Sequence, residues 1–271
     1  MSWRALLKEK ARKAINKPSP YGYDLDLSLY EWGKGEKPSI EGLNTLPQPI
    51  IERSKIMGVD VDEKTVSGMY FQLDSNVVHT NVISKLKSCG VHVMNIEDAL
   101  EKFQWLREYY WKAVPVDLDK YTAVTELHGR HGYFIYVPPG VKVEEPIQAC
   151  LFIHREGVAQ AVHNIIIVDE NAELNLVTAC SALPAKSIHV GISEFFIKKN
   201  AKLNFTMIHN WNESAKVRPR SAAIIEDNGT FISNYIALKP VKDIQMYPEA
   251  LCCLLYTSPS PRDLSTSRMP S

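Results

Sequence analysis

The sequence has no excess of charge of either sign and no long hydrophobic run. Lysine plus arginine and aspartate plus glutamate number 31 each, so the formal net charge of the 271 residues is zero. Nucleic-acid binding generally needs a basic excess that neutralises phosphates, so this balance argues against that function. No apolar stretch reaches the roughly 18 residues of a transmembrane helix, and the segment from Met1 to Lys10 becomes charged too early for a signal peptide. We expect a cytoplasmic protein without nucleic-acid or membrane partners.

Cysteine pairs of the kind that bind metals are missing as well. The five cysteines include no C-x-x-C pair, which argues against a zinc ribbon and against a thioredoxin-like redox site. In a reducing compartment an isolated cysteine is most often a small buried hydrophobic residue. That interpretation is the default for Cys89, Cys150 and Cys180 and for the adjacent Cys252 and Cys253, so the sequence predicts no metal site.

The second half of the chain contains a repeat. A pattern of two apolar residues, two charged residues, Asn-Ala or Asn-Gly, one polar residue and one apolar residue occurs at 167–174, 196–203 and 224–231. Its asparagines are spaced by 29 and 28 residues, and Pro139-Gly140 occupies a similar context 31 residues before the first of them. Such near-constant spacing argues against unrelated hairpins and favours one stacked structural unit.

The chemistry of this unit predicts a tight turn between two strands. Asn171, Asn200 and Asn228 can adopt the left-handed backbone conformation, and the Ala or Gly that follows adds little bulk. A period between roughly 20 and 50 residues is typical of solenoids, in which each unit buries the faces of its neighbours. The expected fold class is mainly β, a parallel β-helix with these asparagines at equivalent corners, preceded by a small α/β region.

Residues 1–115 are expected to form this helical and α/β region. Ser2 is a suitable N-cap for a first helix, and Asn95 for a second helix from Ile96 to about Trp111 with apolar residues on one side. Residues 116–251 then form the β-helix core. That core is expected to be incomplete, because a fourth Asn-type turn is due near residue 257 and does not occur.

The composition changes abruptly from Cys252 onward. Residues 258–271 contain five serines and three prolines without apolar periodicity, and such a segment cannot bury enough apolar surface to fold. We interpret residues 252–271 as a non-native, disordered tail and the solenoid as truncated. Cys252 and Cys253 are rejected as cluster or metal ligands for that reason.

Several long stretches resemble the SufB/SufD family of iron–sulfur cluster assembly scaffolds, and the resemblance covers most of residues 15–250. The most specific stretches are Gly-Tyr-Phe-Ile-Tyr-Val-Pro-Pro-Gly-Val at 132–141, Phe-Thr-Met-Ile-His-Asn-Trp at 205–211, and Ile-Ser-Asn-Tyr at 232–235 with Gln-Met-Tyr-Pro at 245–248. The arm Lys-Pro-Ser-Pro-Tyr-Gly-Tyr at 17–23 is similar to archaeal and short bacterial members.

This resemblance implies a non-enzymatic scaffold subunit of the SUF machinery in the cytoplasm. It implies a right-handed parallel β-helix, flanked by an N-terminal α/β region and a C-terminal helical region. Family members pair, as SufB with SufD or as two copies of one chain, and each docks the ABC-type ATPase SufC. The complex takes persulfide sulfur from a cysteine desulfurase with its sulfur carrier and builds a nascent iron–sulfur cluster. No cluster is expected on this chain alone.

Cys180 is the candidate sulfur acceptor that the resemblance identifies. It lies in Val-Thr-Ala-Cys-Ser-Ala-Leu-Pro at 177–184, which looks like the Gly-Cys-Thr/Ser-Ala-Pro segment of SufB proteins. SufB members are thought to take sulfur onto this cysteine, whereas SufD members generally lack it. A thiolate is the group that attacks a persulfide, and small neighbours leave room for the approach. A buried inert thiol is the alternative.

The same comparison identifies supporting candidates around the next coil. Asn210 and Trp211 lie beside polar and aromatic positions that matter in SufB, although His209 stands where many SufB chains have Gln. Arg218 and Arg220 fall near a basic position of the same region and are candidates to stabilise a thiolate or persulfide by charge. The alternative for both arginines is a solvated loop.

Two other functions stay open at this point. One is a structural, SufD-like solenoid without sulfur chemistry, and the other is a β-helix carbohydrate-active enzyme. Such an enzyme needs clustered carboxylates on one strand face, whereas the acids here lie at turns, as in Asp169-Glu170 and Glu226-Asp227. The family's cluster ligands, a Cys and a neighbouring Glu/His, and its SufC-docking segment belong to later coils and are not assigned to any residue of this chain.

Overall fold

The computed structural model describes residues 2–33, 42–129 and 131–252. The predicted tail, apart from its first residue Cys252, lies outside the described residues. Within the described ranges, no helix has the length and hydropathy needed to span a membrane.

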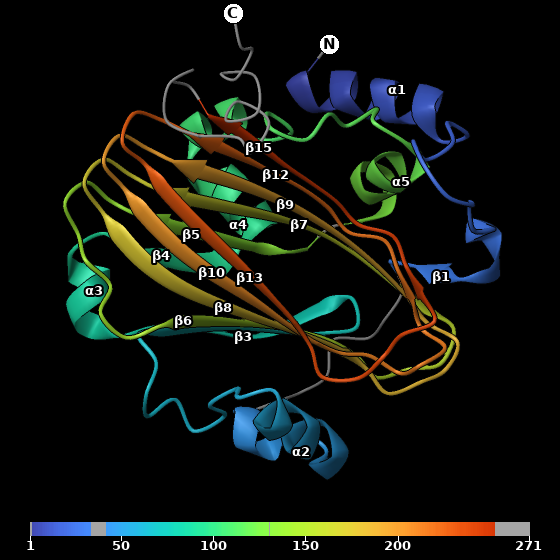
Figure 1. Cartoon of the computed structure of the whole chain (residues 1–271), viewed down its shortest axis with the longest axis horizontal. Helices are drawn as coiled ribbons and strands as arrows, with labels where there is room; N and C mark the ends of the chain where they lie inside the picture. Colours follow the sequence, from blue (N-terminus) through green and yellow to red (C-terminus); the bar gives the residue numbers. More distant parts are fainter. Residues whose placement is uncertain (1, 34–41, 130, 253–271) are drawn as a thin grey trace, which may run out of the picture.

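Short helices are concentrated in the first half of the chain, whereas strands dominate the second half (Figure 1). The helices are α1 (Trp3–Ala14), α2 (Gln48–Ile56), α3 (Ser84–Ser88), α4 (Ile96–Lys102) and α5 (Lys120–His128), with 3-10 turns η1 (Leu27–Leu29), η2 (Leu43–Thr45) and η3 (Gln104–Glu108). The first strands are β1 (Glu31–Trp32), β2 (Gly68–Leu73), β3 (Asn76–Val82), β4 (His92–Asn95), β5 (Tyr133–Val137), β6 (Ile147–Ile153), β7 (Val158–Val168) and β8 (Glu173–Ala182). The later strands are β9 (Ile188–Ile197), β10 (Lys202–Asn210), β11 (Lys216–Val217), β12 (Arg220–Ile225), β13 (Thr230–Ala237), β14 (Asp243–Ile244) and β15 (Tyr247–Cys252).

From β5 onward, successive strands alternate between two facing sheets. One sheet contains β5, β7, β9, β12 and β15, the other contains β6, β8, β10 and β13, and each strand pairs in parallel with the next strand of its own sheet. The chain therefore winds as a β-solenoid, which confirms the predicted fold class (Figure 1). At the first coil, β2 and β6 pair in parallel. Strand β3 then pairs antiparallel with β2 and ends one sheet, and β4 pairs antiparallel with β5 and ends the other.

The three repeated asparagines occupy equivalent corners, as predicted. Asn171, Asn200 and Asn228 have φ of 59°, 58° and 56°, the left-handed conformation that a short polar side chain tolerates. Their side-chain amides form a ladder, in which Asn200 Nδ2 donates to Asn171 Oδ1 at 3.0 Å and Asn228 Nδ2 donates to Asn200 Oδ1 at 3.2 Å. Gly140 takes the same place one coil earlier, with φ of 73°. The repeat thus fixes where each coil turns.

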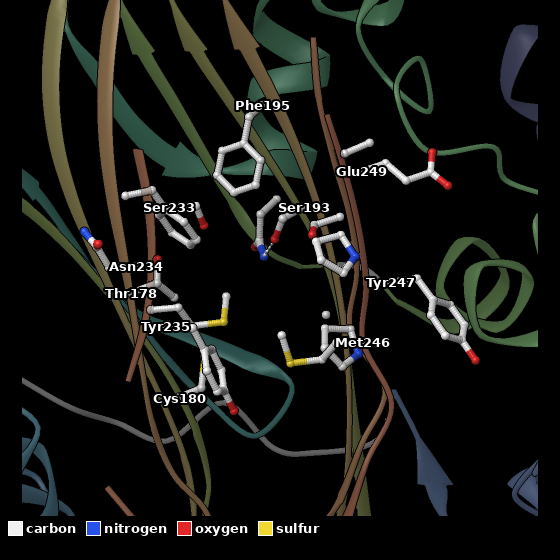
Figure 2. A pocket seen from close by; sticks show the side chains of 18 of the residues that line it. Thr178, Cys180, Ser193, Phe195, Ser233, Asn234, Tyr235, Met246, Tyr247 and Glu249 are labelled. Carbon is white, nitrogen blue, oxygen red and sulfur yellow. Dashed lines mark hydrogen bonds between the residues drawn. The ribbon is translucent and has the colours of Figure 1, made fainter. Parts of the chain in front are cut away.

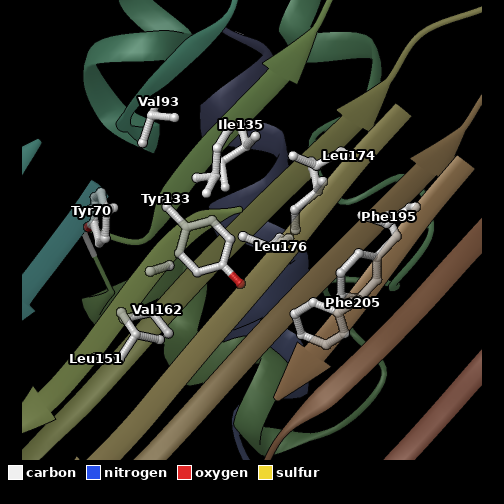
Figure 3. Packing of buried hydrophobic residues seen from close by; sticks show 14 of the residues in the cluster. Tyr70, Val93, Tyr133, Ile135, Leu151, Val162, Leu174, Leu176, Phe195 and Phe205 are labelled. Carbon is white, nitrogen blue, oxygen red and sulfur yellow. The ribbon is translucent and has the colours of Figure 1, made fainter. Parts of the chain in front are cut away.

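Apolar residues fill both the interior of the solenoid and its outer surfaces. Inward-facing side chains of the early coils, such as Tyr133, Val162 and Leu176, pack across the space between the sheets (Figure 3). A second cluster under α2 covers the outer face of β6 and β8, and a third joins α1, α4 and α5 to the outer face of β7 and β9. Strands β6, β7 and β9 are therefore buried on both faces, which explains their long apolar runs, whereas β13 and β15 are largely exposed.

The helix expected from Ile96 to Trp111 is shorter than predicted. It ends at Lys102 and is followed by the separate 3-10 turn η3, and Trp111 has a φ of 58°. Phe103 leaves the helical conformation with φ of −116° and ψ of 99°. Around Trp111, the buried carboxylate of Glu194 accepts the backbone N–H groups of residues 111, 113 and 114 at 2.5–3.0 Å, which holds that segment in a non-helical conformation. The Ser2 cap is confirmed, since its hydroxyl accepts the Ala5 N–H at 3.3 Å.

Candidate functional site

The interior of the solenoid opens into a cavity between its later coils. Its volume is about 450 Å³, within the usual range for small-molecule sites. Its lining combines apolar side chains such as Phe195 and Met246 with polar groups that include Cys180 and Tyr235 (Figure 2). The strands that carry these side chains come from both sheets, β8, β10 and β13 on one side and β9 and β15 on the other.

Cys180 projects into this interior from the middle of β8. Strand alternation points Leu174, Leu176 and Cys180 toward the core, whereas Ala179 belongs to the outer cluster under α2. The residue is 1% exposed, and burial raises the pKa of its thiol well above the ordinary value. At rest the group is therefore a neutral thiol at neutral pH.

His209 is the neighbour of Cys180 on the next coil. The two residues are register partners on β10 and β8, and such partners lie roughly 4.8 Å apart with their side chains on the same face of the sheet. The Nδ1 atom of His209 lies 2.9 Å from the hydroxyl of Tyr235 on β13. Burial, together with nearby His189, lowers the pKa of His209 to about 3, so the imidazole is neutral.

A second neutral imidazole, His189, lies on the opposite wall. Its Nδ1 is 2.9 Å from Oε1 of Gln160, and the Gln160 amide nitrogen donates to the backbone carbonyls of Asp74 and Phe152. Because Oε1 can only accept, Nδ1 of His189 carries the proton and Nε2 is a bare lone pair. Burial lowers the pKa of this residue to about 3. A side chain at Gly191 would meet the ring at 2.7 Å, so glycine makes room for it.

Two of the predicted supporting residues lie close to this group. The indole of Trp211 packs between both imidazoles, with ring centroids 5.0 Å from His189 and 5.1 Å from His209. Its buried Nε1–H has no hydrogen-bond partner among the described residues. Asn210 does not line the cavity; its backbone carbonyl accepts from the Ser181 hydroxyl at 2.7 Å and from Arg53 at 3.1 Å, which connects β10 to β8 and α2.

Arg218 and Arg220 lie elsewhere. Both side chains are buried, which rules out the solvated-loop alternative, and neither lines the cavity. Arg218 pairs with Asp243 at 2.7 Å, and Arg220 pairs with Asp119, the N-cap of α5, at 2.7 Å. They follow the outward-facing positions of this sheet, because Arg220 is in register with Ile192, which packs in the outer cluster. Their charges are already paired and hold α5 against the solenoid.

Sequence reasoning missed His189, Gln160 and Tyr235 as members of this group. A usable signal existed, because a spacing of 29 residues separates Cys180 from His209 and Gln160 from His189. Among the residues that the structure describes, no three His, Cys, Asp or Glu side chains gather as metal ligands. What the arrangement offers is a thiol and two neutral imidazoles on the wall of one interior cavity, with the indole of Trp211 packed against both imidazoles.

Comparison with known proteins agrees with this architecture. Residues 43–149 match the family model described as SufBD protein N-terminal region, and residues 151–243 match the one described as SUF system FeS cluster assembly, SufBD core domain. An iron–sulfur cluster assembly SufBD family protein of Methanothermobacter thermautotrophicus (strain Winter) is 42% identical over 251 residues, which cover 90% of this chain and 60% of the relative.

Two further relatives show the same pattern. A SufBD family protein of Archaeoglobus fulgidus is 46% identical over 73% of this chain and 53% of its own length, and the iron–sulfur cluster assembly protein SufB of Bacillus subtilis is 30% identical over 79% and 48%. The chain thus spans about half to 60% of the length of these relatives. With both family models matched in order, the chain belongs to the SufBD family of iron–sulfur cluster assembly proteins.

Proposed function

We propose that this chain is a SufB-like scaffold subunit of the SUF machinery and that Cys180 accepts persulfide sulfur. The observation that carries the proposal is the position of Cys180 on the cavity wall. Of the other cysteines described, Cys150 packs in the cluster under α2, while Cys89 and Cys252 are exposed. Cys180 alone among these four combines burial with access to a space that holds a small ligand.

The surroundings of Cys180 suit a sulfur intermediate. Apolar walls exclude water, which protects a persulfide from side reactions. The indole of Trp211 packs against both imidazoles of the cavity wall, and its buried N–H has no hydrogen-bond partner among the described residues. In this proposal Trp211 is a supporting residue, whereas Asn210 stabilises the wall and Arg218 and Arg220 stabilise the outer face.

The same proposal covers the partners and the product. The chain works in the cytoplasm as a scaffold rather than as an enzyme, paired with SufD or with a second copy of itself, and docks a SufC-type ATPase. Sulfur arrives from a cysteine desulfurase and its carrier, and the nascent cluster is the cargo of the complete complex. Family membership and the SufB relative support these assignments.

The test uses the complete protein with desulfurase and cysteine. Replacing Cys180 with Ser should abolish loading of sulfur onto the scaffold while leaving the far-UV circular dichroism spectrum unchanged. Cys150→Ala is the matched control, because it removes a second buried thiol from the same sheet and should leave loading intact. Undiminished loading of the Cys180→Ser variant would contradict the proposal.

A SufD-like structural role is the second candidate, and one observation favours it. The Cys180 thiol is fully buried with a raised pKa, as expected for an inert cysteine. The Cys180→Ser experiment separates the two roles, because a structural role predicts no change in sulfur loading. The carbohydrate-active alternative lacks support: Glu249 is the one carboxylate among the cavity-lining residues described, whereas glycoside hydrolysis uses a pair.

A further inference from the structure

The buried thiol of Cys180 must lose its proton before it can react with a persulfide. Attack on a persulfide requires the thiolate, yet burial holds this group as a neutral thiol. The buried site needs a group nearby that takes the proton during the reaction. An adjacent imidazole is the residue that cysteine nucleophiles commonly use, since the resulting ion pair offsets the cost of each buried charge.

His209 has the geometry for this task. It is the register partner of Cys180, and both side chains face the same interior cavity. Its Nδ1 lies 2.9 Å from the Tyr235 hydroxyl, and in the tautomer in which Nδ1 donates to that oxygen, Nε2 carries the lone pair that can accept a proton from Cys180. Tyr235 comes from the following coil, so three successive coils place a thiol, an imidazole and a phenol in one group.

We propose that His209 accepts the proton of the Cys180 thiol when a persulfide donor enters the cavity, and that Tyr235 is the positioning residue that orients the imidazole. This inference rests on the proposed sulfur acceptance at Cys180. His189 is a less direct candidate, because it lies on the opposite sheet and has no register relation to Cys180. It therefore provides a matched control of the same residue type in the same cavity.

The transfer step balances without an added oxidant or reductant. The proton of the Cys180 Sγ moves to Nε2 of His209, and the thiolate attacks the outer sulfur of the donor persulfide. A new S–S bond forms on Cys180 while the S–S bond of the donor breaks. The donor thiolate leaves and takes the proton back from the imidazolium. The products are a Cys180 persulfide and the donor thiol.

Other titratable groups around this pair are few and come from several elements. Those that line the cavity or lie within electrostatic range of Cys180 are His189 on β9, Tyr235 on β13, Tyr247 and Glu249 on β15, Tyr133 on β5 and Cys150 on β6. Tyr133 and Tyr235 have raised pKa values because of burial, so both are neutral at neutral pH. His189 and His209 are consequently the two bases to be distinguished.

The pH dependence of Cys180 alkylation by iodoacetamide tests the proposal. Alkylation is quantified by mass spectrometry on the peptide that contains Cys180, so the other cysteines do not contribute to the signal. With His209 as internal proton acceptor, the logarithm of the rate should be flat between about pH 5 and pH 8. In His209→Gln, which keeps a hydrogen-bonding side chain but no base, it should rise tenfold per pH unit and lie roughly 100-fold below wild type at pH 7.

His189→Gln should keep the flat profile, and Tyr235→Phe should keep it with a rate about 10-fold lower, as for the loss of an orienting group. Because Tyr235 is 43% exposed, that variant also serves if His209→Gln fails to fold. A flat profile in His209→Gln, or a sloping one in His189→Gln, overturns the assignment of His209. If sulfur loading is lost in Cys180→Ser while either of these results is observed, Cys180 is still the sulfur acceptor, although His209 is not its proton acceptor.

Discussion

The two buried cysteines lie on neighbouring strands of one sheet but on opposite faces of it. Cys150 on β6 faces outward and is enclosed by the apolar cluster under α2, whereas Cys180 on β8 faces the interior cavity. Burial raises the pKa of both thiols. Burial therefore does not distinguish the two cysteines. The difference is that the Cys150 thiol is enclosed by an apolar cluster, whereas the Cys180 thiol lines a cavity.

The arginines and imidazoles show the same contrast on the facing sheet. Arg220 points outward into an ion pair that attaches α5, while Ser221 and His189 point into the cavity. The outer faces thus hold the helices and arm onto the solenoid, and the inner face of the later coils carries the candidate chemistry. Perturbations on the two faces should have separable consequences.

The largest expected effect is on the outer face. Arg220→Ala leaves the Asp119 carboxylate buried without its partner and should lower the free energy of unfolding by about 3–5 kcal/mol. Urea denaturation measures this loss, and the alkylation rate of Cys180 in the folded variant should stay at the wild-type value. Lys13→Ala, which removes an exposed pair with Glu9, should leave the denaturation midpoint unchanged. A changed alkylation rate of Cys180 in Arg220→Ala would show that the outer and inner faces do not act independently.

The inner face should dominate the loss of stability in mild acid. Folded His189 and His209 have pKa values lowered to about 3, so between that value and the unfolded pKa of about 6.5 the unfolded chain binds more protons. Stability is fully present above pH 6.5 and falls as the pH drops, by about 1.4 kcal/mol per pH unit for each imidazole.

Denaturation midpoints at pH 7 and pH 5 measure this dependence. Each imidazole should account for about 2 kcal/mol of the difference. His209→Gln and His189→Gln should each remove its own share, and an unchanged difference in both variants would show that these groups are not buried as neutral bases.

The smallest effect is expected at the corners, which belong to neither face. Asn200→Ala forces an apolar residue with a Cβ into the left-handed conformation and removes both hydrogen bonds of the amide ladder, at a cost of roughly 1–2 kcal/mol. Asn200→Gly keeps the conformation available and should cost less. Thermal denaturation compares the stability of the two variants. A lower stability of Asn200→Gly than of Asn200→Ala would contradict the explanation of the repeated asparagines by their left-handed backbone conformation.

The solenoid could be predicted because its corners depend on local residue type. Asn171, Asn200 and Asn228 each need only their own backbone preference, so the requirement recurs visibly along the chain. The non-helical backbone of residues 111–114 could not be predicted, because it is held by the buried carboxylate of Glu194, far along the chain. A contact between residues so far apart in the chain produces no periodic pattern in the sequence.

Only part of the candidate site could be predicted from the sequence. The repeat period relates Cys180 to His209, so the neighbour across the coil is encoded in the spacing. Which face a residue occupies depends on strand parity, and a shift of one position reverses it. Arg220 and Ser221 differ by one residue, yet one lies in the outer ion pair and the other lines the cavity. The bends between β11 and β12 obscure that parity in the sequence.

Mapping the position of transferred sulfur tests the central claim most directly. The complete protein is incubated with cysteine desulfurase and cysteine, and its persulfides are trapped and located by peptide mass spectrometry. The added sulfur atom should be found on the peptide that contains Cys180 and should be absent from the peptide that contains Cys150. Sulfur on Cys150, or an unmodified Cys180 after full turnover of the desulfurase, would contradict the assignment of the chemistry to the inner face.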